Sequence, residues 1–220
     1  MKRQLLLFIF IASSVITFAQ SPSFGIRAGL SSAGMRGEAS NNLKDLLDFS
    51  NGMITTGNHT GFFGGANVSI PVSNLISFEP ALYYAQKGYE LTGALNIKGL
   101  DFLGANAKAR LNTHYIDMPV VVKANIKGFQ VFAGPQISYL VSANLRTTAG
   151  VLGFNLLNRK MDATEQFNRW DAALTGGVGY KLANGISITA SYDHGLSKTD
   201  KNQNLEAYNR SFKLGLGFNF

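Results

Sequence analysis

SFKLGLGFNF, residues 211–220, gives the clearest indication of how this chain folds. Apolar residues at every second position, from Phe212 to Phe220, alternate with Ser, Lys, Gly, Gly and Asn. This period of two is typical of a β-strand with one apolar face. An apolar strand that ends on Phe220 suits a barrel in a lipid bilayer, where lipid covers one face and neighbouring strands satisfy the backbone. The stretch therefore predicts a membrane-embedded barrel.

Seven further stretches alternate in the same way and complete the expected sheet. They cover residues 24–31, 60–70, 75–91, 111–126, 129–145, 170–182 and 186–197, and the last strand begins near Tyr208. The connections alternate between short turns at 71–74, 127–128 and 183–185 and long polar segments at 32–59, 92–110, 146–168 and 198–207. Short turns at one end and long loops at the other are typical of outer-membrane barrels, which have an even number of strands. We therefore expect an all-β fold, an eight-stranded antiparallel up-and-down transmembrane β-barrel with both termini in the periplasm.

A soluble, lipocalin-like barrel is the structural alternative, because it shows the same alternation with its apolar face turned inward. An export signal, scarce charge on the apolar face and aromatic residues near strand ends favour the membrane. In the first long segment, the leucines at 43, 46 and 47 predict either one or two helical turns over residues 42–49 or packing onto the barrel rim. We expect lipid contact and aromatic girdles from Phe24, Leu30, Tyr84, Tyr139, Trp170, Tyr180, Phe218 and Phe220.

The N-terminal residues predict export. Lys2 and Arg3 precede an apolar run over residues 5–11, and Thr17 and Ala19 supply small residues at a cleavage site. We expect a signal peptide over residues 1–19 and a barrel domain over residues 20–220, with an uncleaved anchor as the alternative. The sequence has no cysteine, which excludes a lipoprotein anchor and disulfides.

The composition agrees with a membrane barrel. Charged residues make up 15% of the chain, against about 25% in soluble domains. Removal of the signal lowers the net charge from +7 to +5, because Lys2 and Arg3 leave with it. A basic balance can indicate nucleic acid, but the basic residues are scattered and an exported barrel does not meet nucleic acid. We expect outer-membrane lipid and the phosphates of lipopolysaccharide as partners instead.

The inward faces of the expected strands carry eight charged residues. An eight-stranded barrel is just wide enough inside for side chains, and buried charges need partners. We expect a structural network of ion pairs that plugs the lumen, with an ion path or proton relay as the alternative. Arg27 should pair with Glu79 at one depth, and Lys213 with Asp117 or Asp193 at another. The eight residues are Arg27, Glu79, Asp117, Lys123, Asp171, Lys181, Asp193 and Lys213.

No catalytic residue, cofactor site or metal site is predicted. His59, His114 and His194 lie near strand ends, and His194 points away from the face that Ser191 and Asp193 share. The glycine-rich stretches at 61–67 and 175–180 lack the phosphate-loop pattern. We expect a non-enzymatic barrel with a structural or surface-binding role. A narrow pore for small solutes is the alternative.

Five stretches in order resemble the PorT-like outer-membrane β-barrel proteins, which carry an outer membrane protein β-barrel domain. The most specific piece is YIDMP at 115–119, where that family usually shows Tyr, an apolar residue, an acid, an apolar residue and Pro. The resemblance covers essentially the whole mature chain and implies insertion by the outer-membrane assembly machinery. It also implies secretion-system proteins as candidate partners, because the family takes its name from a member tied to secretion. The stretches are FGIRAGL (24–30), YIDMPVVVK (115–123), FAGPQISYL (132–140), WDAALTGGVGYKL (170–182) and LGLGFNF (214–220).

Overall fold

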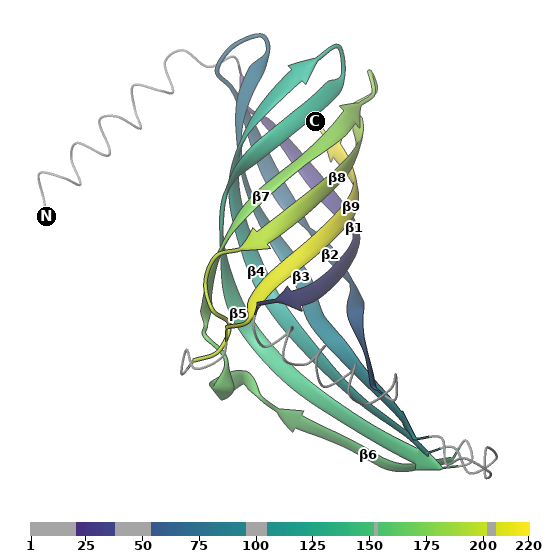
Figure 1. The fold of residues 1–220 in the computed structure, drawn as a ribbon. Coiled ribbons are helices and arrows are strands. Elements are labelled where there is room, and N and C mark those ends of the chain that lie inside the picture. Colours follow the sequence, from purple (N-terminus) through teal and green to yellow (C-terminus); the bar gives the residue numbers. More distant parts are fainter. Residues whose placement is uncertain (1–20, 38–53, 96–104, 152–153, 202–205) are drawn as a thin grey trace, which may run out of the picture.

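A computed structural model arranges the chain as a closed antiparallel β-barrel (Figure 1). It describes residues 21–37, 54–95, 105–151, 154–201 and 206–220. The strands run in the order β4-β3-β2-β1-β9-β8-β7-β5-β6, and a β4–β5 pairing closes the ring. Eight strands therefore form the expected up-and-down ring, and β6 lies outside it. The bounds are β1 Ser23–Arg36, β2 Ile54–Pro71, β3 Ile76–Leu95, β4 Ala105–Ile126, β5 Phe129–Val151, β6 Phe154–Asp162, β7 Trp170–Lys181, β8 Ile186–Gly195 and β9 Tyr208–Asn219, with a 3-10 turn at Thr164–Gln166.

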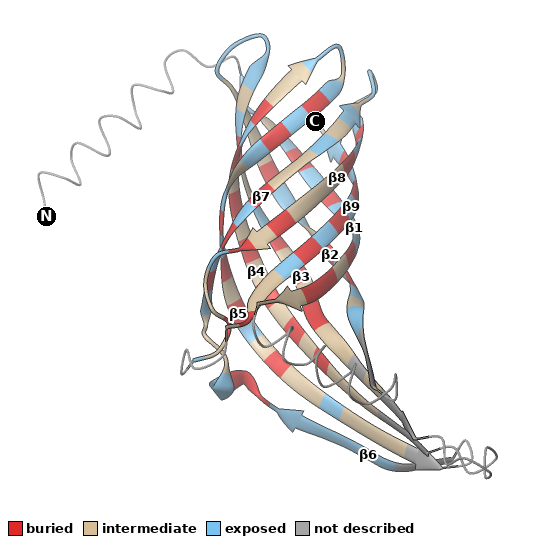
Figure 2. Cartoon of the chain, in the orientation of Figure 1, coloured by how far each residue is buried: buried red, intermediate tan, exposed pale blue. Residues whose placement is uncertain are grey.

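The faces of the strands show which alternative is correct. Along β9 the exposed and buried positions alternate: Leu214 is 66% exposed and Lys213 only 5%. Figure 2 shows the same banding on neighbouring strands. Apolar side chains point out and polar side chains point in, which is the reverse of a soluble lipocalin-like barrel. The membrane alternative fits this polarity.

Aromatic side chains form two bands on the outside of the barrel. Near the short turns, Phe129 pairs with Tyr180, and Phe24 and Phe218 lie on adjoining strands. At the other end, the rings of Tyr139 and Trp170 are 5.0 Å apart, and Phe62–Tyr84 and Tyr192–Phe212 pairs lie on other strands. Amphipathic aromatic rings favour the two membrane–water interfaces. The apolar surface between the bands is therefore the part that lipid covers.

Parts of three segments that the sequence predicts as long loops are strands: residues 32–36, 54–59, 92–95, 105–110, 146–151 and 154–162. β3, β4 and β5 continue beyond the ring, and β6 pairs with β5 where β7 no longer does. We call this open sheet the arm: residues 54–58, 88–95, 105–112, 144–151 and 154–162. Its mixture of Thr, Asn, Arg and Ala lacks a clear apolar alternation, so the sequence resembles a loop. Pairing with neighbouring strands nonetheless satisfies the backbone. The expected signal peptide and the helical turns at 42–49 lie outside the described residues.

The short turns follow the prediction. β4 and β5 are joined by Lys127 and Gly128, whose φ angles of 52° and 91° are those of a two-residue hairpin turn that matches strand twist. The short turns lie at one end of the barrel and the arm at the other (Figure 1). The chain's last residue lies at the short-turn end, where the Phe220 amide donates to the Phe24 carbonyl at 2.9 Å.

A bulge corrects one expected side-chain direction. The register between β4 and β5 shifts between His114 and Tyr115, so β5 carries an extra residue there. Leu140 and Ala143 are both fully buried, and Ser142, which the alternation predicts inside, is not. A bulge places two residues opposite one and reverses the faces beyond it.

None of the described helical residues forms a helix long and apolar enough to cross a membrane.

Candidate functional site

The lumen holds a lower cluster of charges, nearer the short turns, around Glu79. One carboxylate oxygen of Glu79 accepts from Arg27 Nη2 at 3.1 Å, and the other contacts the ammonium of Lys123. Arg27 also donates through Nη1 to the Tyr83 hydroxyl at 3.1 Å. All four side chains are less than a tenth exposed. Since one acid joins strands β1, β3 and β4, this cluster ties half of the ring together.

An upper cluster, nearer the arm, is built around Asp117. Its Oδ1 lies 2.8 Å from Lys87 Nζ and its Oδ2 lies 2.8 Å from Lys213 Nζ. Lys213 also lies 2.7 Å from the Asp193 carboxylate. Asp117 is fully buried, and removing a charge from water is costly unless a close partner compensates. The chain of four charges therefore holds together only as a complete set.

Asp171 is buried beside the upper cluster with neutral partners. The Ser197 hydroxyl donates to its Oδ1 at 2.6 Å, and the Asn209 side-chain amide donates to its Oδ2 at 2.7 Å. Asp171 lies directly opposite Ser138, to which Lys87 donates at 3.3 Å. With Asp171 included, the two clusters contain four cationic and four anionic side chains.

Aromatic rings line the same space. Lys213 lies 5.5 Å from the centre of the Phe63 ring, and Lys123 lies 5.8 Å from that of Phe132. Lys87 lies 4.7 Å from the Tyr115 ring. A cation over an aromatic face is attracted by the ring's negative face, and more strongly when both are out of water. These rings fill the volume that the ion pairs leave.

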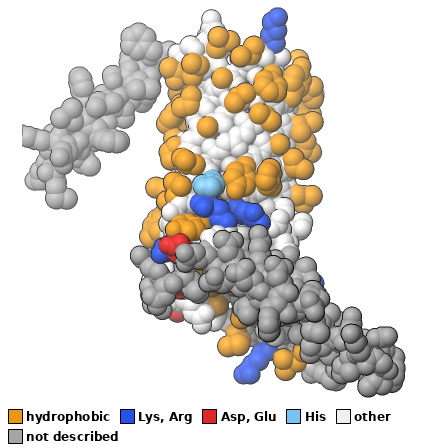
Figure 3. Space-filling view, in the orientation of Figure 1, with side chains coloured by type: hydrophobic (Ala, Val, Ile, Leu, Met, Phe, Trp, Pro, Cys, Tyr) orange, Lys and Arg blue, Asp and Glu red, His pale blue; other side chains and the backbone are white. Residues whose placement is uncertain are grey.

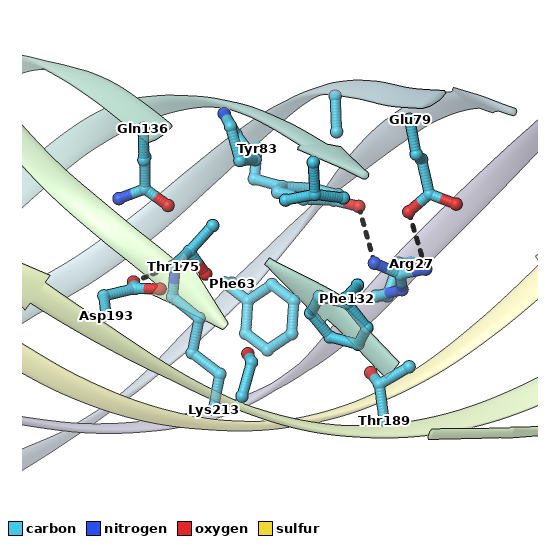
Figure 4. A pocket seen from close by; sticks show the side chains of 14 residues that line it. Arg27, Phe63, Glu79, Tyr83, Phe132, Gln136, Thr175, Thr189, Asp193 and Lys213 are labelled. Carbon is cyan, nitrogen blue, oxygen red and sulfur yellow. Dashed lines mark hydrogen bonds and ion pairs between the residues drawn. The ribbon is translucent and has the colours of Figure 1, made fainter. Parts of the chain in front are cut away.

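The space between the two clusters is small. A cavity of about 30 Å³ lies among Arg27, Glu79 and Tyr83 on one side and Asp193 and Lys213 on the other (Figure 4). One water needs about 10–15 Å³ measured in this way, so the cavity has room for two or three waters. A cavity of this size is too small for a solute much larger than water.

The structure brings together most of the residues expected in the lumen. Arg27 pairs with Glu79, as expected, and Lys213 contacts both of the acids proposed for it. Lys181 departs from the expectation: it is half-buried at the end of β7 and makes no ion pair with any described residue. Its strand ends at the short-turn rim of the barrel.

Lys87 is the lumen charge that sequence reasoning missed. It is only 2% exposed and supplies the second cation on Asp117. The sequence could have revealed this role, because Lys87 is an even number of residues from Glu79 and Tyr83 along β3 and therefore points to the same face. The expected strand was long enough to include it, but its position close to the expected loop concealed its role.

The histidines do not form a catalytic arrangement among the described residues. His114 Nδ1 lies 2.6 Å from the Tyr84 hydroxyl on the outer surface. Among the described residues, no histidine hydrogen-bonds to a serine or a carboxylate. In the same part of the chain, no group of three His, Cys, Asp or Glu side chains could hold a metal ion.

Comparison with known proteins identifies the family. A family model described as "Outer membrane protein beta-barrel domain" matches residues 18–201, which is most of the chain. The chain belongs to this family. It is an outer-membrane β-barrel protein, and its resemblance to the PorT-like subgroup stays a prediction. No curated protein sequence matches the chain.

Several solved structures are distantly similar to this chain. Neisserial surface protein A is 12% identical, with a TM-score of 0.47, and the match covers 91% of this chain and all of that one. Ail, the attachment invasion locus protein of Yersinia pestis, is also 12% identical over 91% of this chain and 100% of its own, with a TM-score of 0.43. OprG from Pseudomonas aeruginosa gives the same identity and TM-score over 91% of this chain and 97% of its own.

Proposed function

We propose that this protein is an outer-membrane barrel closed to solutes, which presents its arm outside the cell as a structural or binding surface. The observation that carries this proposal is the filled lumen. Two ion-pair clusters, joined by aromatic rings, leave a cavity of only about 30 Å³. Binding must therefore take place on the outer surface, and the arm is the largest described structure beyond the ring.

The orientation is part of the proposal. Barrels of this kind have short turns on the periplasmic side and long connections outside. The short turns and the C-terminal Phe220 lie at one end, so both belong in the periplasm, and the arm belongs at the cell surface. The expected partners, lipid, lipopolysaccharide and the assembly machinery that inserts the barrel, fit this placement.

Conductance in planar bilayers tests the closed lumen. We expect no channel events from the purified protein, because buried ion pairs hold the charges of the two clusters in the lumen. Regular single-channel steps that scale with protein concentration would support the narrow pore instead.

An epitope inserted into the β5–β6 hairpin, matched with one in the turn at 183–185, tests orientation. Only the first should be reached by antibody on intact cells.

A second candidate function is a subunit of a secretion assembly. The observation that favours it is the edge of β6, which pairs with β5 on one side and with no described strand on the other. An exposed edge can accept a strand from another protein. Cross-linking from a residue placed at 158, followed by mass spectrometry, tests this candidate. Recurrent capture of one protein at the edge would support it, and lipid-only products would count against it.

A further inference from the structure

The outer face of the arm carries a row of basic side chains. Glu90, Arg110, Arg146 and Lys160 lie directly opposite one another on β3, β4, β5 and β6. Opposed residues on neighbouring strands point to the same face, and the strands are about 4.8 Å apart. The row therefore places three cations and one acid side by side.

This face is continuous with the lipid-facing side of the barrel. Alternate residues of β4 point to the same face, so Arg110 lies on the same face as Ile116, which points outward. Leu111 and Tyr115, on the opposite face, are buried. The Arg110 guanidinium donates to Glu90 at 2.7 Å, and Arg146 donates to Asn158 at 3.1 Å, which confirms that these side chains share one face. The row thus lies beyond the aromatic band of Tyr84, Tyr139 and Trp170, on the same side of the sheet.

The charges on this face are not balanced. Glu90 is already bound by both Lys108 and Arg110. Arg146 and Lys160 are exposed and make no ion pair with any described residue. The nearest acid along β6, Asp162, is hydrogen-bonded to Thr164, and it interacts with Lys160 by charge without forming an ion pair. Among the described residues, these two cations of the row therefore have no acidic partner within ion-pair distance, and their charges can attract an anion.

Another side of the barrel is also basic, closer to the aromatic residues. Beyond the aromatic residues Tyr192 and Phe212, β9 carries the exposed Arg210, opposite His194 on β8. Figure 3 shows Lys, Arg and His side chains gathered beneath the zone of exposed hydrophobic side chains. Basic groups at this level face the layer where lipid head groups carry phosphate.

From this placement we propose that Arg146 and Lys160, supported by Arg110 and Lys108, bind the phosphate groups of an outer-leaflet glycolipid. Arginine offers paired donors that fit phosphate, and lysine adds a point charge. Thr148 and Asn158, in the neighbouring row of the same face, supply neutral hydrogen-bonding groups for sugar hydroxyls. The proposal rests on the proposed orientation, because only that orientation places the arm beside the outer leaflet.

Arg159 provides a matched control. It is the neighbour of Lys160 on β6, is also exposed, and lies opposite Thr147 on the other face of the arm. Lys160→Gln and Arg159→Gln therefore remove one charge each from the same strand. Only the first removes it from the proposed site.

The experiment measures binding of diphosphorylated lipid A to the full chain in detergent micelles, for the native protein, Arg146→Gln/Lys160→Gln and Arg159→Gln. We expect the double variant to lose about tenfold or more in affinity, since hydrogen bonds to charged groups are strong. Arg159→Gln should bind nearly as the native protein does. Lipid A without its phosphates should bind all three proteins weakly and equally.

Four results would overturn the proposal. These are equal losses in the double variant and Arg159→Gln, unchanged binding in the double variant, no preference for phosphorylated lipid A, and full competition by inorganic phosphate at matching concentration. The last would point to a site for free phosphate. Resistance of the folded barrel to unfolding by detergent before heating verifies that each variant is folded. Conductance and epitope access are measured separately, so failure of lipid binding is distinguishable from failure of the proposed function.

Discussion

Lys213 on β9 and Asp117 on β4 meet across the lumen, with Nζ and Oδ2 2.8 Å apart, although 96 residues separate them in the chain. The two strands are diametrically opposed in the ring of eight. The pair therefore links the last strand to the far wall, and it can form only when the barrel has closed. Its stability and the closure of the ring are coupled.

Removal of the Asp117 charge should destabilise the barrel severely. Asp117→Asn leaves Lys87 and Lys213 buried with only Asp193 to compensate, and a broken buried pair costs about 3–5 kcal/mol. Urea unfolding in lipid vesicles measures the loss. Asp193→Asn is the matched variant and should cost less, because Asp193 contacts one lysine rather than two. A larger loss for Asp193→Asn would contradict this ranking.

The two faces of β4 should respond differently to a new charge. Val120 points outward, midway between the two ends of the membrane-spanning part of β4, so Val120→Arg should impair insertion by about 2–4 kcal/mol. Val121 is 5% exposed and lines the cavity with Arg27, so Val121→Arg should fail through overpacking and cationic repulsion. Folding yields in vesicles and in detergent separate the causes. Full insertion of Val120→Arg would contradict the assigned register.

The seam between β1 and β9 requires Gly29. A Cβ on Gly29 would lie 1.9 Å from the Leu214 carbonyl oxygen, which is part of the neighbouring backbone. Gly29→Ala should therefore force the two strands apart and cost about 1–3 kcal/mol, as overpacking does. Thermal unfolding checks this. Gly57→Ala is the control, because its Cβ would meet nothing closer than 4.0 Å, and comparable losses in both variants would disprove the steric explanation.

The arm should show an acid with a lowered pKa. Hydrogen bonding from Lys108, with Arg110 as a further partner, lowers the pKa of Glu90 below its ordinary value. The stabilisation by these pairs is present above the unfolded-state pKa and is lost as the pH falls through the folded-state pKa. NMR titration of the labelled Glu90 carboxyl measures it. Lys108→Gln should raise this pKa and Lys201→Gln should not; equal shifts would mean that Glu90 senses only the net charge.

The ring of eight strands was predictable because the apolar face of each strand repeats every second residue. Lipid contact imposes that pattern on every spanning segment, so it is written locally in stretches such as 211–220. The short turns were predictable for a similar reason, since Lys127 and Gly128 need positive φ angles that few residues adopt. The same alternation predicts that Arg27, Glu79 and Lys213 point into the lumen.

The arm and the bulge were not predictable, because neither leaves a regular apolar alternation in the sequence. β6 pairs with β5 through backbone groups, and the sequence of β6 carries no strong alternation. The bulge between β4 and β5 moves Ser142 away from the lumen without any glycine or proline at that position.

The alternation and the inward-facing charges depend on neighbours along one strand, so they could be predicted from the sequence alone. The pairing of those charges depends on closure of the ring, because closure sets the distance between opposite walls. That closure places Lys213 against Asp117, admits Lys87 as a second partner, and leaves Lys181 at the rim. It also aligned Arg110, Arg146 and Lys160 in one row, because register between strands is fixed by pairing rather than by any single segment.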